Sequence, residues 1–339
     1  MIDAQQIKDL GQEFGIDTIK IAGAQPLLDA AARIKQQKNA GLYLPNEHWH
    51  RRNIDEFCDV RSVLPGAKSI VAACQCYLTD EEINNGTSGD PYGLIARYTW
   101  RNHYSDLRKR LRKIAQVLEK RHAAECMVYS NGGIAEKPIA QQCGVGYYGK
   151  HSIMINQTFG SWIVLGEIVN TLEIEPDAPI DAGCRDCTIC IEACPTKAII
   201  EPYVIDRRLC IQARTNWYGV LPNEIARVWG NRLYGCTICQ DICPANRNVT
   251  AKRPRTDIGY VGPSLSLVEI IKMDETQYRR DYSNNQITAS WINFRAIQRN
   301  AIIALGNIRD PKTLPLLGKL TKNHDTVIAQ SARWAIGNF

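Results

Sequence analysis

The sequence lacks an apolar run long enough to cross a bilayer, which would need roughly 20 consecutive apolar residues. Its first residues, MIDAQQIKDLGQEFGI, lack the basic-then-apolar order of a signal peptide. It also lacks a GxGxxG turn after a strand and a complete GxxxxGK[ST] P-loop, so nucleotide cofactors are not supported. The net charge of +6 is too small to indicate an anionic partner by itself. We therefore expect a cytoplasmic protein without a membrane association.

Cysteine, in contrast, is abundant: the 339 residues include thirteen. Disulfides are poor candidates for them, because the cytosol keeps thiols reduced. Eight fall between Cys184 and Cys243, and this concentration indicates metal binding rather than scattered core thiols. The apolar fraction of 45% and the charged fraction of 22% are those of an ordinary globular protein, and the length predicts two or three domains.

The spacing of these cysteines predicts two [4Fe–4S] clusters. The first four form C-x2-C-x2-C-x3-C-P, the run of bacterial two-cluster ferredoxins, in which the fourth cysteine binds the other cluster. A second copy lacks its first cysteine, because Leu233 stands there, and we assign Cys210 as the replacement. One cluster would be held by Cys184, Cys187, Cys190 and Cys243, and the other by Cys194, Cys210, Cys236 and Cys239. Zinc ribbons also use C-x2-C pairs and are the alternative.

The regions flanking the cysteines predict three domains. Residues 1–178 read as an α/β (α+β) domain, with strand-length apolar runs at 69–78 and 162–169. Between these runs, residues 105–122 predict a helix with an apolar face. A linker rich in proline and acids at 173–183 leads into a ferredoxin-like domain at 179–255.

The remaining residues, 256–339, contain a weak repeat. Residues 299–307 read RNAIIALGN and residues 330–338 read QSARWAIGN. This repeat predicts α-helical, HEAT-like hairpins. Such hairpins either form a binding surface or simply cap the core, and the sequence favours neither.

Several motifs together resemble the epoxyqueuosine reductase family, and the resemblance covers almost the whole chain. Besides the cysteine runs and RNAIIALGN, they are LPGAKSIV at 64–71, RYTW at 97–100, GVGYYGK at 144–150, FGSWIVLGE at 159–167, EPYVI at 201–205 and GNRLYGCTICQDIC at 230–243. The resemblance implies two [4Fe–4S] clusters and base-off cobalamin in the N-terminal domain. It implies reduction of epoxyqueuosine to queuosine in tRNA, by a monomer supplied by a low-potential donor of the flavodoxin or ferredoxin type. The chain lacks the DxHxxG motif that supplies a cobalt-binding histidine, as the family does.

The resemblance also implies positions for the cofactor contacts. Cobalamin contacts would fall at Arg97, Lys150, Met154 and Leu165, those at the last two being largely backbone contacts. The loops that carry Gln212 and Gln240 would face the corrin.

The chain departs from the family pattern on the substrate side. Ser130 stands where the family has the aspartate proposed as proton donor, and a serine hydroxyl is a far weaker acid. The family's D-Y-H segment is changed to His103-Tyr104-Ser105. We therefore predict Ser130, His103 and Tyr104 as catalytic candidates.

Other acids could also take over the proton transfer. Tyr129 and Glu136 are candidates, although an ordinary carboxylate in the first turn of a helix is the simpler explanation for Glu136. After Cys210, the family's S-[YF]-L-T is replaced by QART at 212–215.

Three hypotheses follow. The first is a cobalamin-dependent reductase acting on epoxyqueuosine in tRNA, with phosphate contacts from Arg247, Lys252, Arg253, Arg255, Arg279 and Arg280. The second keeps the cofactors but changes the substrate to a small molecule with a reducible carbon–heteroatom or sulfur bond, because Ser130 replaces the acid. The third is an electron carrier that holds clusters only.

Overall fold

A four-stranded antiparallel sheet forms the centre of the N-terminal half. The computed structural model describes residues 2–339, and the strand order of this sheet is β1-β2-β8-β5. Every residue of β2 and β8 is buried, as expected for the two apolar runs that predicted them. The strands are β1 (Thr18–Gly23), β2 (Ser69–Cys76), β5 (Cys126–Tyr129) and β8 (Ile163–Asn170).

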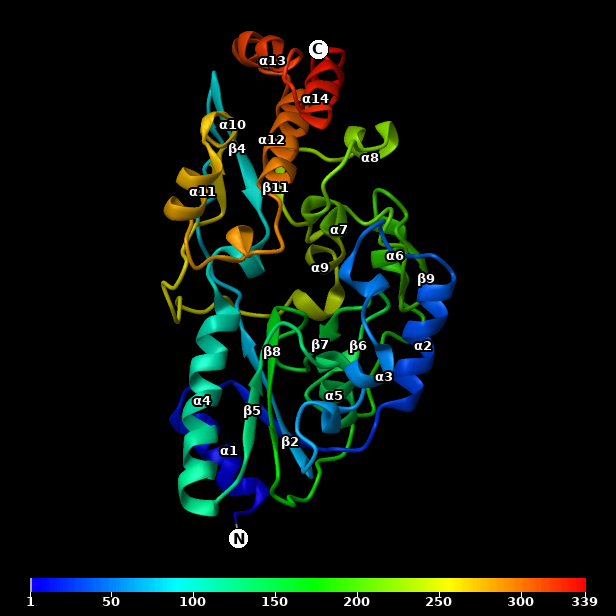
Figure 1. The fold of residues 1–339 in the computed structure, drawn as a ribbon, viewed down its shortest axis with the longest axis vertical. Helices are drawn as coiled ribbons and strands as arrows, with labels where there is room; N and C mark the ends of the chain where they lie inside the picture. Colours follow the sequence, from blue (N-terminus) through cyan, green and yellow to red (C-terminus); the bar gives the residue numbers. More distant parts are fainter. Residues whose placement is uncertain (1) are drawn as a thin grey trace.

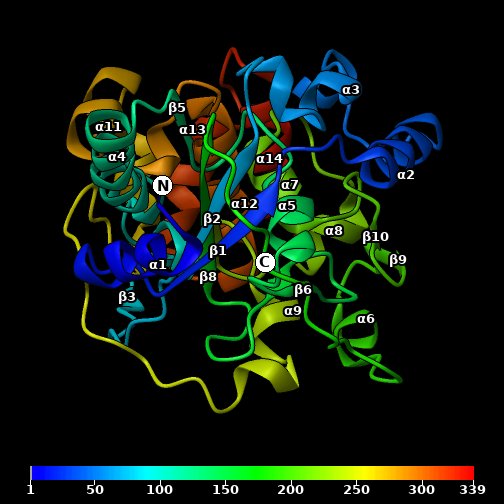
Figure 2. The same cartoon turned by 90° about the horizontal axis from the view of Figure 1, so that it is seen from below.

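Helices cover both faces of this sheet (Figure 2). On one face lie α1 (Ala4–Glu13) and α4 (His103–His122), and on the other lie α5 (Glu136–Gln142) and the hairpin of β6 (Tyr147–Tyr148) and β7 (Met154–Ile155). The helix predicted at 105–122 is confirmed as α4, whose predicted apolar face packs on β8. Gly166 permits this close packing of α4 on β8. A Cβ at this position would lie only 2.7 Å from Leu111 Cδ1, which is too close for two carbon atoms.

Short elements complete the N-terminal half beside the sheet. They are α2 (Leu28–Asn39), α3 (Ile54–Phe57) and the 3-10 turns η1 (His48–His50), η2 (Val60–Ser62) and η3 (Arg97–Thr99). None of the described helices is both long and apolar enough to cross a membrane.

A second sheet joins three distant parts of the chain. Its order is β11-β4-β12, with β3 (Gly86–Thr87) paired to β4. The strands are β4 (Asp90–Ile95), β11 (Arg232–Tyr234) and β12 (Ser264–Ser266). Each of the three predicted domains therefore contributes a strand. The boundaries at 178/179 and 255/256 stay a prediction, and this sheet crosses both of them.

The cysteine-rich region is built from short elements between the two halves (Figure 1). They are α6 (Ile189–Ala193), β9 (Ile199–Glu201), β10 (Val204–Ile205), α7 (Ile211–Asn216), α8 (Asn223–Arg227), α9 (Ile238–Asp241) and the 3-10 turn η4 (Pro244–Asn246). The predicted linker at 173–183 forms no helix or strand. It is held to β1, because the Asp177 carboxylate accepts hydrogen bonds from Lys8 at 2.6 Å and from the Ile21 amide at 2.8 Å.

The C-terminal residues form helices at the end of the molecule opposite the N-terminus (Figure 1). The two copies of the repeat lie in α12 and α14, which pack against each other; the hairpins as HEAT-like units stay a prediction. The elements are α10 (Leu267–Lys272), α11 (Glu275–Asp281), η5 (Gln286–Thr288), α12 (Phe294–Ile308), η6 (Pro311–Thr313), α13 (Leu314–Leu320) and α14 (Thr326–Ile336).

The first copy of the repeat braces the cysteine-rich region. Arg299 is fully buried and donates hydrogen bonds to the carbonyls of Gly219, Arg214 and Trp217. Asn300 donates to the carbonyls of Thr215 and Leu233. Because Arg214 and Thr215 lie in α7, the start of the RNAIIALGN motif fixes the helix that follows Cys210.

Asp17 ties the connection after the cysteines to the central sheet, and its replacement gives a test. Its carboxylate accepts hydrogen bonds from Lys252 at 2.8 Å, from Arg255 and from the Cys76 amide at 2.8 Å. We expect Asp17→Asn to lower the free energy of unfolding by about 2–3 kcal/mol, because buried charge-assisted hydrogen bonds are lost. Chemical denaturation measures this change.

Asp55→Asn is the matched control for this prediction. Asp55 also pairs with a lysine, at 2.7 Å from Lys35, but its side chain is 70% exposed. Exposed pairs contribute under about 1 kcal/mol, so the control should unfold almost like the wild type. Equal losses in the two variants would contradict the cross-linking role of Asp17.

Candidate functional site

The eight cysteines of the predicted cluster region come together in two sets. Burial raises the pKa of Cys190 to about 11, and the nearby thiols of Cys184, Cys243 and Cys187 add to the shift. Burial also raises the pKa of Cys239 well above its usual value, with contributions from Cys236, Cys210 and Cys194 and a further one from Cys190. The first thiol set is Cys184, Cys187, Cys190 and Cys243, and the second thiol set is Cys194, Cys210, Cys236 and Cys239.

The backbone explains how the two copies of the motif exchange a cysteine. In each copy a short helix, α6 or α9, includes the third cysteine, and the two helices pack together. Cys194 and Cys243 then adopt an extended backbone before a proline, with ψ of 114° and 126°. A residue before proline favours this conformation, which ends the helix and carries the fourth thiol onward. Cys210 directly precedes α7 and faces the second thiol set.

Six side chains between the central sheet and the second thiol set form a ring of neighbours, and we name the region inside this ring the central hollow. Burial raises the pKa of the three acids and of the thiol in the ring and lowers that of Lys137, whereas the Glu47 carboxylate raises the pKa of Arg207. In each pair of consecutive members, one raises or lowers the pKa of the other. In order, they are Tyr98, Tyr104, Glu136, Lys137, Arg207 and Cys210.

The two predicted glutamines hold the loops of the second thiol set against neighbouring residues, and one of these, Tyr98, belongs to the ring. Gln212 donates to the Tyr98 hydroxyl at 2.8 Å and accepts from the Cys236 amide at 3.2 Å. Gln240 is buried and donates to the Tyr77 hydroxyl at 3.0 Å and to the Ser161 carbonyl at 2.9 Å. Both side chains therefore position the cysteine loops, and a role for them in cofactor binding stays a prediction.

The other predicted cofactor contacts lie in different surroundings. Arg97 stacks 4.8 Å above the Trp100 ring and donates to the Thr79 carbonyl at 3.2 Å. Met154 is buried in β7, and Leu165 is buried in β8. Lys150 donates to the Arg185 carbonyl at 2.6 Å, beside the loop of the first thiol set, and its role as a cobalamin contact stays a prediction.

The three predicted catalytic side chains differ in what they can do. Ser130 is fully buried, its hydroxyl donates to the Leu165 carbonyl at 2.7 Å, and its own carbonyl accepts from Arg108. Burial lowers the pKa of His103 to about 4, so this imidazole is neutral and cannot act as an acid at neutral pH. Burial raises the pKa of Tyr104 well above its usual value, which keeps its phenol protonated beside the hollow.

A buried pair of carboxyl groups was missed in the sequence. Glu167 is fully buried in the middle of β8, and neither of its oxygens has a hydrogen-bond donor among the described residues. It contacts Glu136 at the start of α5. The signal was present, because an acid inside the apolar run WIVLGEIV needs a partner once both faces of the strand are covered.

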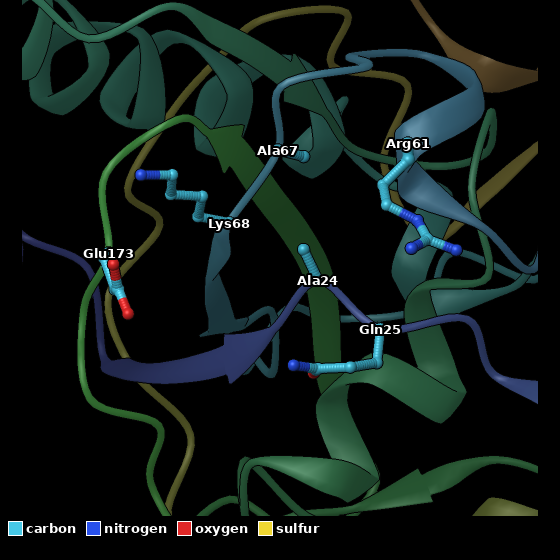
Figure 3. Close-up of a pocket in the computed structure, with 6 residues that line it drawn as sticks. All are labelled: Ala24, Gln25, Arg61, Ala67, Lys68 and Glu173. Atoms are coloured by element: carbon cyan, nitrogen blue, oxygen red, sulfur yellow. The ribbon is translucent and has the colours of Figure 1, made fainter.

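Two cavities lie away from these residues. The first, of about 340 Å³, opens at the end of the sheet remote from the thiols and is lined by Ala24, Gln25, Arg61, Ala67, Lys68 and Glu173 (Figure 3). The second, of about 480 Å³, adjoins α3 and is lined mainly by Asp55, Glu56 and Asp59. Neither contains a predicted site residue, and their lining is charged and open, unlike a cofactor site.

The basic residues predicted to contact tRNA fall into two groups in the structure, those held in ion pairs and those that are exposed. Lys252 and Arg255 are committed to Asp17, and Arg279 pairs with Glu275. Arg280 pairs with Asp281 but is itself 72% exposed. Arg247 and Arg253 are exposed on the connection that follows the second thiol set. These three are the better placed for phosphate contacts.

Two families match parts of the chain. Residues 183–246 match "4Fe-4S double cluster binding domain", so this region is of the two-cluster iron–sulfur type and not a zinc ribbon. Residues 58–130 match "Epoxyqueuosine reductase QueG, DUF1730".

Solved structures of similar proteins share the fold. An epoxyqueuosine reductase crystallised with an epoxyqueuosine-modified tRNA-Tyr stem loop is 28% identical, with a TM-score of 0.90 over 98% of this chain and 89% of that chain. The Bacillus subtilis epoxyqueuosine reductase with its catalytic aspartate loop swung out of the active site is also 28% identical, with a TM-score of 0.89 over the same shares. The mixed α/β architecture is therefore that of these enzymes.

Curated relatives match over nearly the full length. The epoxyqueuosine reductase of Staphylococcus aureus (strain NCTC 8325 / PS 47) is 30% identical over 99% of this chain and 90% of its own. That of Escherichia coli (strain K12) is 29% identical over 98% of this chain and 88% of its own. The chain belongs to the epoxyqueuosine reductase family.

Proposed function

We propose that this protein reduces epoxyqueuosine to queuosine in tRNA, using two [4Fe–4S] clusters and cobalamin. The observation that carries the proposal is the spatial order of the two thiol sets and the central hollow. The first thiol set, the second thiol set and the central hollow follow one another, linked by the Cys190–Cys239 and Cys210–Tyr98 neighbours. The full-length similarity to epoxyqueuosine reductases supplies the substrate class.

The residues present fit these cofactors. Eight thiols in two sets of four supply the donor number of two [4Fe–4S] clusters. The central hollow is lined by hydroxyl, carboxyl and cationic groups that can hydrogen-bond to the amide-rich edge of a corrin. When bound, the clusters and the cobalt would supply low-potential electrons beside the substrate.

The protein's own groups would hold and orient these parts. Gln212 links the Cys236 amide to the Tyr98 hydroxyl of the ring, and Gln240 fixes the loop of the second thiol set to Tyr77 and Ser161. Arg97, Lys150, Met154 and Leu165 remain our proposed cobalamin contacts. A low-potential flavodoxin or ferredoxin would donate electrons at the first thiol set, where the neighbouring Arg185 and Asp186 are exposed.

The tRNA would approach from the side of the exposed arginines. Our proposed phosphate contacts are Arg247, Arg253 and Arg280. If they bind the tRNA backbone, the affinity for tRNA should fall as the salt concentration rises. The C-terminal helices, which we retain as HEAT-like hairpins, brace the cysteine region from the other side. The monomeric state and cytoplasmic location also remain proposals.

A second candidate keeps the cofactors and changes the substrate. Ser130 stands in place of the family's acid and its hydroxyl is committed to the Leu165 carbonyl, which favours a reaction with a different proton requirement. A small molecule with a reducible carbon–heteroatom or sulfur bond would then be the substrate.

The test of the proposed function is conversion of the modified tRNA. Anaerobically purified protein should contain about eight irons per chain and, after reconstitution, bind cobalamin. With a chemical reductant, it should convert epoxyqueuosine to queuosine in a stem loop, as measured by nucleoside mass spectrometry. Full iron and cobalamin without conversion, and without tRNA binding at low salt, would refute the tRNA substrate and leave the small-molecule candidate.

A further inference from the structure

The Glu136–Glu167 pair has three carboxyl oxygens whose hydrogen bonding the described residues do not satisfy. Both oxygens of Glu167 and Oε1 of Glu136 lack a hydrogen-bond donor among the described residues, although all three are buried. Two ionised carboxylates in contact would repel each other in a medium of low dielectric constant. A single proton between them turns the repulsion into a hydrogen bond and satisfies the orphaned oxygens.

The surroundings keep this proton in the pair. Burial raises the pKa of Glu136 to about 7, although the backbone amides of Gly132 and Asn131 and the charges of Lys137 and Arg108 lower it. Burial raises the pKa of Glu167 well above its usual value, and Glu136 adds to the shift. The charged groups that face the pair are Lys137 from α5 and Arg108 from α4, the loop before α5 supplies the two amides, and β8 supplies Glu167.

The pair also reaches the central hollow. Glu136 is a member of the ring that encloses the hollow, and it lies close enough to Tyr104 to raise the pKa of that phenol. Glu167 lies behind it in the sheet. Ser130, in contrast, is fully buried with its hydroxyl donated to a backbone carbonyl.

We propose that Glu136 and Glu167 share one proton and that Glu136 delivers it, through the Tyr104 hydroxyl, to the oxygen released from the substrate in the central hollow. The inference rests on the proposed function and assigns the acid that Ser130 cannot provide. Removing an epoxide oxygen as water breaks both carbon–oxygen bonds, forms a carbon–carbon double bond and consumes two electrons and two protons. The electrons come from the external low-potential donor, one proton comes from the pair, and the second comes from solvent.

Single-turnover kinetics test the delivery. The wild-type rate should fall about tenfold per pH unit above pH 7, because the pair must be protonated to act as an acid. Glu136→Gln should lower the rate by at least about 100-fold at pH 7. In Glu167→Gln, the rate should instead begin to fall at a lower pH, because the new amide donates a hydrogen bond to Glu136 and favours the ionised form of that carboxyl. Glu173→Gln, at an exposed acid remote from the hollow, is the matched control.

Infrared spectroscopy of the holoenzyme without substrate tests the stored proton independently of activity. A carboxylic-acid carbonyl band should disappear as the pH rises through about 7, and no band should titrate there in Glu136→Gln. An undiminished rate in Glu136→Gln, with the loss appearing in Ser130→Ala instead, would overturn the proposal. A titrating band in a wild type that reduces no epoxyqueuosine would refute the proposed function and support the stored proton. Reduction without such a band would refute the stored proton alone.

Discussion

Replacing Cys210 by alanine should reduce the iron content from about eight to about four atoms per chain and abolish reduction of epoxyqueuosine. Cys210 is the one proposed ligand that lies outside both C-x2-C runs, and it neighbours Cys236 and the ring residue Tyr98. Its loss removes a thiol from the set beside the central hollow. The first thiol set keeps all four members, so one cluster should remain. Iron analysis and electron paramagnetic resonance of the reduced protein measure both effects.

Cys126→Ser is the matched control for this experiment. Cys126 is a half-buried thiol in β5, remote from both thiol sets. Its replacement by serine should therefore leave the iron content and the reduction of epoxyqueuosine unchanged. Circular dichroism would establish that Cys210→Ala is folded. A folded Cys210→Ala protein that still holds about eight irons would show that another residue completes the second cluster.

Replacing Arg299 by alanine should lower the free energy of unfolding by about 3–5 kcal/mol. The guanidinium is fully buried, donates to three backbone carbonyls and lies 5.7 Å from the centre of the Trp229 ring. Alanine leaves those carbonyls without donors and opens a cavity beneath α7. Because α7 begins directly after Cys210, we also expect faster loss of iron during dialysis against a chelator.

Arg333→Ala is the control from the second copy of the repeat. Arg333 donates to one carbonyl, that of Thr321, at an exposed position of α14. Such surface changes usually alter stability by under about 0.5 kcal/mol. If both variants unfold at the same denaturant concentration as the wild type, α12 does not brace the cysteine region.

Local patterns in the sequence were enough to predict several parts of the fold. The central strands β2 and β8 and the helix α4 follow directly from apolar runs and helical periodicity, because their side chains are buried on defined faces. The division of the cysteines follows in part from the local spacing of the two motifs, whereas Cys210, which lies outside both, was assigned as the cysteine that remained in the region. The neighbours in the structure agree with that division, and the ligands themselves stay a prediction.

Long-range contacts account for what the sequence did not reveal. β4 pairs with strands about 140 and 170 residues away, and no local pattern encodes those partners. The Glu136–Glu167 pair depends on α5 folding over β8, so neither acid alone indicates the contact. The Lys150 assignment came from the family resemblance and stays a prediction, while its amine donates a hydrogen bond to the Arg185 carbonyl.

The second sheet sets the order in which the protein can mature. β4 is synthesised early, but its neighbours β11 and β12 emerge only after residues 232 and 264, and α12 follows later still. Until then α7 has no brace, and the thiol of Cys210 has no fixed direction. We therefore expect iron insertion into the second set to be a late event that waits for nearly the whole polypeptide to leave the ribosome. A ribosome stalled before α12 would carry a nascent chain able to assemble the first cluster at most.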